Sequence, residues 1–302
     1  MVYNSLWLVL YNWWFRVDHS YGISTLDYIY MNDMRKRIIT LIALLSFLMT
    51  VSCQRKASVE ELWISNGERN IYGLLSRPAK GQKRQPVLII SHGFNGSHDF
   101  GKNYFPLLDE LGYQCYTFDF GCGSLGSRTD NNTMNMSILD ECSDLKAVVE
   151  HFRSRPDVDP DGIVLLGESQ GGLISALVAS EMPDAVDKLI LIFPAFCIPD
   201  NWNQRYPDVT EIPDTTWLWD VPLGKRFFQE IRDMNVFSGM EQFDAPVLIV
   251  QGDKDPIVSI EDSRRAVGLY EDAHLHVIPG AGHGFNPDEF AESLEHIRMF
   301  LD

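Results

Sequence analysis

The sequence predicts an α/β fold, with a mostly parallel central sheet that is covered by helices on both faces. Three observations favour this class. Short apolar runs, such as residues 162–166 and 188–193, are typical of strands that are buried on both sides. Amphipathic stretches with helical spacing follow these runs in regular alternation. A chain of 302 residues, 45% hydrophobic and 22% charged, is also long enough to build a large core.

The charge and the cysteines exclude several kinds of partner. The chain has 25 Lys+Arg against 42 Asp+Glu, a net charge of −17, and no basic stripe. Nucleic acid and anionic lipid surfaces are therefore not expected to bind. The cysteines show neither a CxxC motif nor a Cys/His ligand spacing, so no metal site is expected. They are Cys53, Cys115, Cys122, Cys142 and Cys197.

The stretch before residue 53 has the pattern of a secretory signal. Three basic residues at 35–37 precede the uncharged, mostly apolar run 38–51, which is shorter than the roughly 20 residues that span a bilayer. The segment resembles a bacterial lipoprotein signal, which implies lipidation of Cys53. The alternative is an uncleaved anchor.

This signal defines the expected domain organisation and location. Because signals belong at the N-terminus, we expect translation to start at Met34. The protein should then be exported to the periplasm or cell surface, with a lipid at Cys53 as its only membrane attachment. The expected segments are a non-native extension (1–33), a lipoprotein-type signal peptide (34–52), a short linker (53–58) and one folded domain (59–302).

The elements of the domain follow in a regular order. Two antiparallel strands, 60–65 and 70–76, are expected to be joined across Asn66-Gly67. Buried strands then alternate with helices. The strands are predicted at 86–91, 114–120, 162–166, 188–193, 246–251 and 274–278, and the helices at 103–111, 137–152, from 173 onward, 260–270 and 288–301.

This alternation stops after the sixth strand. The stretch from about 195 to 243 is rich in aromatic residues and prolines and is too long for an ordinary connection. It predicts a small cap over one end of the sheet. A Gly-x-Gly-x-x-Gly stretch at 121–126 does not predict a dinucleotide site, because no helix opens directly after it.

The turn after the strand 162–166 carries the expected nucleophile. Residues 167–171 form a Gly-x-Ser-x-Gly motif between a buried strand and a helix, which is the context of a nucleophile elbow. Glycines on both sides of Ser169 allow a strained turn, and the helix N-terminus favours negative charge at the serine. The alternative is a Gly-Ser turn without chemistry.

An acid and a histidine follow this serine in the order expected for the fold. Asp255 lies in the loop after strand 246–251, and His283 lies between glycines after strand 274–278. The carboxyl ends of parallel strands meet at one edge of the sheet, so the three groups can converge. Asp253 is the alternative acid, whereas His92, His274 and His276 are expected to be structural.

An oxyanion needs two fixed N–H donors. One should be the backbone N–H of Gln170, the residue after the nucleophile. The second should be the N–H of Phe94, which follows His92-Gly93 in the loop after strand 86–91.

Residues from about 60 to 302 resemble an α/β-hydrolase, and within that superfamily the bacterial cinnamoyl/feruloyl esterases. In that group the serine, the aspartate of the G-x-x-D stretch and the late histidine form a triad, which implies Ser169, Asp255 and His283. The cap covers the acyl pocket there, which implies that Trp219 binds substrate; the alternative is that Trp219 belongs to the cap's own core. The resemblance rests on His92-Gly93-Phe94, Ser169-Gln170-Gly171-Gly172, Pro194-Ala195 with Ile198-Pro199, Trp219-Asp220 and Gly252-Asp253-Lys254-Asp255.

These features predict a secreted serine carboxylesterase that hydrolyses small or aromatic, hydroxycinnamoyl-type acyl esters without a cofactor. Its expected partner is a small-molecule ester. A serine peptidase, which would need a group in the cap for the substrate amine, is one alternative. An acylglycerol lipase, which would need a larger exposed apolar patch, is another. A non-catalytic binding protein is disfavoured by the complete Ser/Asp/His order.

Overall fold

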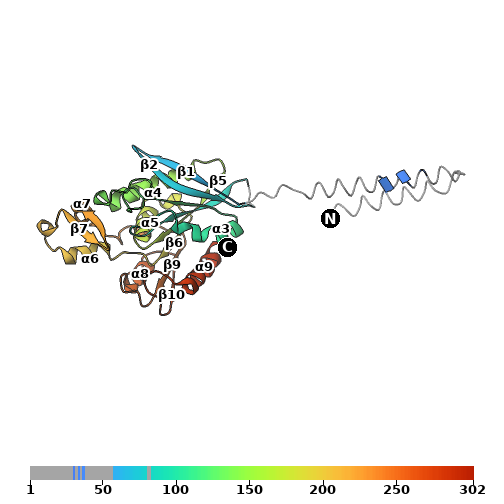
Figure 1. Ribbon diagram of the computed structural model, residues 1–302. Helices are drawn as coiled ribbons and strands as arrows, with labels where there is room; N and C mark the ends of the chain where they lie inside the picture. Colours follow the sequence, from blue (N-terminus) through green and yellow to red (C-terminus); the bar gives the residue numbers. More distant parts are fainter. Residues whose placement is uncertain (1–29, 31–32, 35, 38–56, 80–82) are drawn as a thin grey trace. The chain divides into compact units, whose positions relative to one another are not determined.

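The computed structural model of the chain (Figure 1) describes residues 30, 33–34, 36–37, 57–79 and 83–302. The chain divides into two units, Met1–Gln54 and Arg55–Asp302. Cys53 and most of the expected signal lie outside the described residues. Within the described part of the chain, no helix is long and apolar enough to cross a bilayer.

An eight-stranded sheet organises the unit Arg55–Asp302. Its strands are β1 (Ser58–Asn66), β2 (Arg69–Arg77), β3 (Gln85–Ser91), β4 (Gln114–Phe118), β5 (Val158–Glu168), β6 (Lys188–Ile192), β9 (Val247–Gly252) and β10 (Ala273–Ile278). Their order across the sheet is β1-β2-β4-β3-β5-β6-β9-β10. β2 pairs antiparallel with β1 and β4, and the other neighbours are parallel. The predicted mostly parallel sheet is therefore confirmed.

Helices cover both faces of this sheet. Side chains of α4 (Ile138–Arg153), α5 (Gln170–Glu181) and α8 (Ile260–Val267) belong to one hydrophobic core, and those of α3 (Phe105–Leu111) and α9 (Pro287–Leu301) belong to the other. α3 and α9 lie near the C-terminus in Figure 1. Parallel sheets need this cover on both faces, because crossover helices return over each side.

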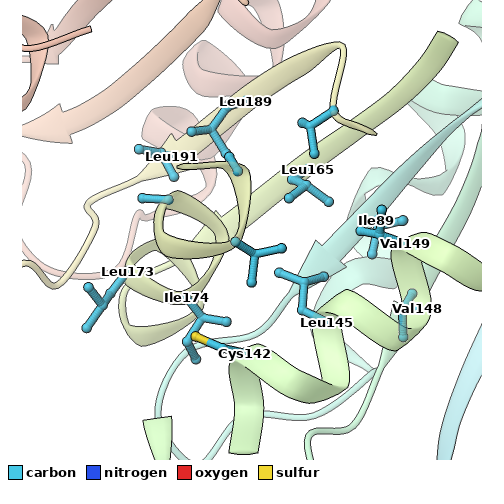
Figure 2. Close-up of a cluster of buried hydrophobic side chains, with 14 of the residues drawn as sticks. Ile89, Cys142, Leu145, Val148, Val149, Leu165, Leu173, Ile174, Leu189 and Leu191 are labelled. Atoms are coloured by element: carbon cyan, nitrogen blue, oxygen red, sulfur yellow. The ribbon is translucent and has the colours of Figure 1, made fainter. Parts of the chain in front are cut away.

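Single strands supply side chains to both cores. In β3, Val87 and Ile89 point into one core, and Leu88 and Ile90 point into the other. Successive residues of a strand face opposite sides, so an uninterrupted apolar run is the pattern that a doubly covered strand requires. Figure 2 shows the first core, where residues of β3, β5 and β6 meet α4 and α5; they include Ile89, Leu165, Leu189, Leu145 and Ile174.

Several predicted elements differ at their ends; β5, for example, runs from Val158 to Glu168, whereas the strand was predicted over 162–166. The helix expected at 103–111 begins as the 3-10 turn Phe100–Tyr104, and α3 starts with a proline in its first turn. β4 ends at Phe118 because Asp119 leaves the sheet and its carboxylate accepts from the His98 and Arg128 N–H groups. α8 ends before Gly268 rather than near residue 270.

The predicted cap lies between β6 and β9. It contains α6 (Ile198–Arg205), a two-stranded antiparallel sheet of β7 (Thr215–Leu218) and β8 (Val221–Gly224), and α7 (Lys225–Glu230). Figure 1 shows α6, β7 and α7 grouped at one end of the unit. The cap is anchored by buried aromatic residues, among them Phe227 and Phe228, which join the core shared with α4 and α5.

Candidate active site

Ser169 occupies a strained turn between β5 and α5. Its φ is +53° and its ψ is −116°, a conformation that side chains rarely adopt. The neighbouring glycines are required by contact: a Cβ on Gly167 would lie 2.2 Å from the Gly171 carbonyl oxygen, and one on Gly171 would lie 2.2 Å from the Ser91 carbonyl oxygen. The Gly-x-Ser-x-Gly spacing therefore follows from the close packing of the elbow on β3.

The elbow is also fastened to the end of β6. The Ser169 N–H donates to the Ile192 carbonyl (2.9 Å), and the Ala195 N–H donates to the Ser169 carbonyl (2.8 Å). These two bonds satisfy the backbone of the strained residue on both sides. Because the cap begins directly after them, the cap is positioned from the same point of the sheet as Ser169.

The structure brings Ser169, His283 and Asp255 into one hydrogen-bonded chain. The His283 Nδ1–H donates to Asp255 Oδ2 (2.8 Å), so Nε2 is left as the acceptor for the Ser169 hydroxyl (3.1 Å). The Asp255 side chain is 1% exposed and that of His283 is 16% exposed. A hydroxyl, an imidazole and a buried carboxylate in this order form the arrangement that activates a serine nucleophile.

Asp255 is further held by its own loop. Its Oδ1 accepts from the Ile257 N–H (2.8 Å) and the Val258 N–H (2.9 Å), which leaves Oδ2 directed at His283. Asp253, the alternative acid, instead accepts from the Gly280 N–H (2.7 Å). Asp253 thus joins the two loops, and Asp255 is the carboxylate that reaches the histidine.

Phe193, which the sequence pattern did not predict as a site residue, packs against the imidazole of His283. The two ring centroids are 4.7 Å apart, and the Phe285 ring lies 4.9 Å from Phe193 on another side. Phe193 is buried and its φ is +35°, so its backbone is held in an unfavourable conformation at the end of β6. No motif marks this residue, since a phenylalanine at a strand end is common.

One predicted oxyanion donor, Phe94, lies in a loop beside Ser169, and the other, Gln170, follows Ser169 in the sequence. A Cβ on Gly93 would lie 3.2 Å from the Ser169 Cβ, so the loop that carries Phe94 passes directly beside the nucleophile. Within the described residues, neither the Phe94 N–H nor the Gln170 N–H donates to another protein group. Two unpaired donors beside a serine can hold a negatively charged oxygen.

His92 shapes this loop rather than facing the serine. The Phe120 N–H donates to His92 Nε2 (3.3 Å), so the Nδ1–H donates to the Gly93 carbonyl (2.7 Å). Burial lowers the pKa of His92. A neutral, fully bonded ring fits the structural role that the sequence analysis expected for it.

The side chain of Gln170 binds a buried carboxyl group that no sequence motif predicts. Gln170 Nε2 donates to Glu141 Oε2 (2.8 Å), and Glu141 on α4 is 0% exposed. Burial raises the pKa of Glu141 to about 8. A Cβ on Gly123 would lie 2.8 Å from the Phe120 Cβ and 2.9 Å from Glu141 Oε1, so close packing at this point accounts for Gly123 of the glycine-rich stretch 121–126.

A cavity of about 380 Å³ opens beside Ser169. Its size lies within the range of small-molecule sites in proteins. Side chains of the cap and of the loops around Ser169 line it, and most are apolar. The lining includes Phe94, Ala195, Cys197, Ile198, Trp202, Arg205, Leu218, Trp219, Phe227 and Val258.

Trp219 lies at this cavity and not in the core of the cap. The residue is 62% exposed, and its ring centroid is 5.9 Å from that of Phe94. Trp219 and Asp220 form the two-residue turn between β7 and β8, with φ values of +47° and +63°. Such turns favour Asn-Gly, so a tryptophan here is held at a cost of about 1–2 kcal/mol.

The described cysteines are free thiols. Cys197 lines the cavity, and burial raises the pKa of its thiol to about 11. A thiol with a raised pKa is a weak nucleophile, so Ser169 is the stronger candidate in this cavity. The others are Cys115, Cys122 and Cys142.

Solved structures and sequence relatives agree with this architecture. The ferulic acid complex of Est1E from Butyrivibrio proteoclasticus is 25% identical, with a TM-score of 0.73, over 80% of this chain and 97% of that one. The pimeloyl-[acyl-carrier protein] methyl ester esterase of Sodalis glossinidius is 26% identical over 50% of this chain and 74% of its own length. The sn-1-specific diacylglycerol lipase of Xenopus laevis is 23% identical over 72% of this chain and 80% of its own length.

The family assignment rests on the match to a family model. The alpha/beta hydrolase family model matches residues 87–293, which is more than half of the chain and runs from β3 to α9. This range contains the elbow, the cap and the loops of Asp255 and His283. The chain therefore belongs to the alpha/beta hydrolase family.

Proposed function

We propose that this chain is a serine carboxylesterase that acts on small or aromatic acyl esters. The observation that carries the proposal is the chain of hydrogen bonds from Ser169 through His283 to Asp255, at the mouth of an apolar cavity. The likeness to an esterase structure that binds ferulic acid supports an aromatic acyl group of the hydroxycinnamoyl type.

In the first half-reaction, Ser169 Oγ attacks the ester carbonyl while its proton passes to His283 Nε2. The carbonyl oxygen becomes an oxyanion, which the Phe94 and Gln170 N–H groups hold. Asp255 keeps the proton on Nδ1 and stabilises the imidazolium. When the tetrahedral intermediate collapses, His283 gives its proton to the departing alcohol, and the acyl group remains on Ser169.

In the second half-reaction, water replaces the alcohol. His283 Nε2 takes a proton from the water, whose oxygen attacks the acyl-enzyme carbonyl at the same oxyanion site. Collapse of the second intermediate returns the proton to Ser169 Oγ and releases the carboxylic acid. Each proton is transferred through His283, so the cycle needs no cofactor.

The lining of the cavity supports an aromatic acyl group. The rings of Phe94, Trp202, Trp219 and Phe227 all line it, and flat rings pack well against one another. Arg205 is the charged residue of the lining, and its guanidinium lies 5.3 Å from the Trp202 ring centroid. A phenolic or other electron-rich substituent on the acyl ring would find a donor there.

The same lining disfavours a peptidase that binds a free substrate amine. An ammonium group is normally held by carboxylates, and no aspartate or glutamate belongs to the cavity lining in the described part of the chain. Within 4 Å of Arg205, the described residues offer no carboxylate either. A cationic substrate would therefore meet a guanidinium without a counter-ion.

An acylglycerol lipase is the second candidate, because the cap presents exposed aromatic rings. Trp217 and Trp219, on the hairpin of β7 and β8, are 64% and 62% exposed. Rings of this kind favour contact with lipid surfaces. The diacylglycerol lipase relative agrees with this alternative, so acylglycerols belong in the substrate panel.

We also propose that the protein is exported and anchored by a lipid at Cys53. The basic run at 35–37, the uncharged run 38–51 and the small residue before Cys53 support this assignment. Mass spectrometry of membrane-extracted protein should find a chain that begins at an acylated Cys53. A mature chain that retains residues 1–52, or that lacks an acyl group, would contradict it.

The activity is tested with a fluorophosphonate probe and an ester panel. The wild-type protein should be labelled and should hydrolyse hydroxycinnamoyl and acetyl esters, whereas Ser169→Ala should lose labelling and about 10⁴–10⁶ in rate. The melting temperature of the variant should match that of the wild type. A folded wild-type protein that takes no label and hydrolyses no ester would indicate a non-catalytic binding protein.

A further inference from the structure

A cluster of three side chains joins the last strand to the last helix, away from the cavity. His276 lies on β10, the edge strand of the sheet, and Glu292 and His296 lie on α9. Residues four apart on a helix share one face, so Glu292 and His296 point the same way. One nitrogen from each histidine and one carboxylate oxygen all lie within 4.8 Å of one another.

The contacts within this cluster are close. His276 Nε2 donates to Glu292 Oε1 (2.8 Å), and the rings of His276 and His296 are stacked with their centroids 3.3 Å apart and an interplanar angle of 22°. The ring nitrogens of both histidines thereby lie beside the Glu292 carboxylate. Neutral imidazole is the form that binds metal ions.

The carboxylate of Glu292 has no competing cation. Among the described residues, no lysine or arginine nitrogen lies within 4 Å of it, and its ion-pair partner is His276. Arg298, two residues after His296, is instead bound by Glu110. The carboxylate is thus available to an ion that binds the ring nitrogens of the two histidines.

We propose that His276, Glu292 and His296 form a binding site for one Zn²⁺ ion. Two imidazole nitrogens and a carboxylate oxygen are a donor set that divalent transition metals prefer over Mg²⁺ or Ca²⁺. The His276 side chain is 24% exposed and that of Glu292 is 44% exposed, so water can reach the ion and complete a tetrahedron. On binding, the imidazole proton of His276 moves from Nε2 to Nδ1, so that Nε2 binds the ion and Glu292 remains beside it as a ligand.

The position of the site gives the ion a structural effect. β10 ends at Ile278 and α9 begins at Pro287, so the ligands lie on the two elements that flank the loop of His283. An ion bound to both elements would hold them together and oppose unfolding of this end of the sheet. The ligands do not contact Ser169 or the cavity, so hydrolysis does not depend on the ion.

Calorimetric titration of the chelator-treated full chain with Zn²⁺ tests this site. One ion per chain should bind, and Zn²⁺ at about 100 times its Kd should raise the Tm by about 5 °C. Glu292→Gln and His296→Ala should each weaken binding by about tenfold or more. The matched control is His274→Ala, on the same strand, whose side chain is 79% exposed.

Spectra with Co²⁺ give a direct readout of coordination. The wild-type protein and His274→Ala should show the intense visible bands of a tetrahedral ion, and the two ligand variants should not. Equal Zn²⁺ affinity in the wild type and both ligand variants would overturn the proposal, because the ion would then bind elsewhere on an acidic chain. Failure of the wild type to bind Zn²⁺ would also overturn it.

Discussion

Trp219 of the cap contacts Phe94 of the oxyanion loop, with ring centroids 5.9 Å apart and an interplanar angle of 66°. The segment that covers the cavity thus touches the residue whose N–H is proposed to hold the oxyanion. Both rings also line the cavity beside Ser169. Substitutions in the cap should therefore change the relative kcat/KM values for esters that differ in their acyl group.

Trp219→Ala should lower kcat/KM for hydroxycinnamoyl esters, because an aromatic acyl group loses a flat apolar surface. The loss should correspond to about 1–3 kcal/mol of transition-state binding free energy. Acetyl ester hydrolysis should change much less, since a two-carbon acyl group does not reach the cap. The measurement is the ratio of the two specificity constants. Trp217→Ala is the control, as Trp217 lies on the same hairpin but outside the cavity lining. Equal losses on both esters would leave Trp219 without a role in selectivity.

Asp220→Gly should stabilise the protein without changing selectivity. Asp220 has a φ of +63°, and glycine adopts this conformation at less cost. The expected gain is about 0.5–1 kcal/mol, observed as a small rise in Tm. Asp214→Gly, an exposed change outside the turn, should not raise the Tm. A lower Tm for Asp220→Gly would show that the turn is not strained at this residue.

Asp255→Asn should lower kcat by about 10⁴, because an amide cannot stabilise the imidazolium and favours the wrong tautomer of His283. Asp253→Asn should change kcat by less than about tenfold, since an amide oxygen can still accept from the Gly280 N–H. Single-turnover kinetics on the two variants separates these effects. If Asp253→Asn were the more damaging, the acid would have to be reassigned.

Glu141→Gln should make stability less dependent on pH. Burial raises the pKa of Glu141 from 4.5 to about 8, so its contribution is complete below about pH 4.5 and is lost as the pH rises through 8. The wild-type free energy of unfolding should fall by on the order of 2–4 kcal/mol more than that of the variant between pH 5 and pH 8.5.

Denaturant unfolding at the two pH values provides the measurement for Glu141→Gln. Glu150→Gln, an exposed change on the same helix, is the matched control and should follow the wild type. Parallel pH dependence of the wild type and Glu141→Gln would mean that Glu141 is already charged in the folded protein.

The positions of the side chains that follow the parallel strands could be predicted from the sequence. Ser169, Asp255 and His283 each follow a buried parallel strand, and the carboxyl ends of such strands lie at one edge of the sheet. Order and spacing therefore predicted which side chains come together. The fold class followed from the same runs, since only a doubly covered sheet buries every residue of a strand.

Contacts that depend on how separate elements pack together could not be predicted from the order and spacing of residues. Glu141 lies in the first turn of α4, and its bond to Gln170 depends on how that helix packs on α5. Phe193 reaches His283 through an unusual backbone conformation that no local pattern marks. The ligands of the proposed zinc site are divided between a strand and a helix, so their spacing matches no metal motif.

The cap, which contributes part of the cavity lining, contains none of the hydrogen-bonded residues Ser169, His283 and Asp255. α6, β7, β8 and α7 all lie between β6 and β9, whereas Ser169 precedes this insertion and Asp255 and His283 follow it. Substitution, shortening or exchange of the insertion can therefore alter which ester is accepted while the nucleophile and its base keep their sequence and supports. Such changes would alter the lining that Trp202, Trp219 and Phe227 contribute and leave Phe94 and Val258 in place.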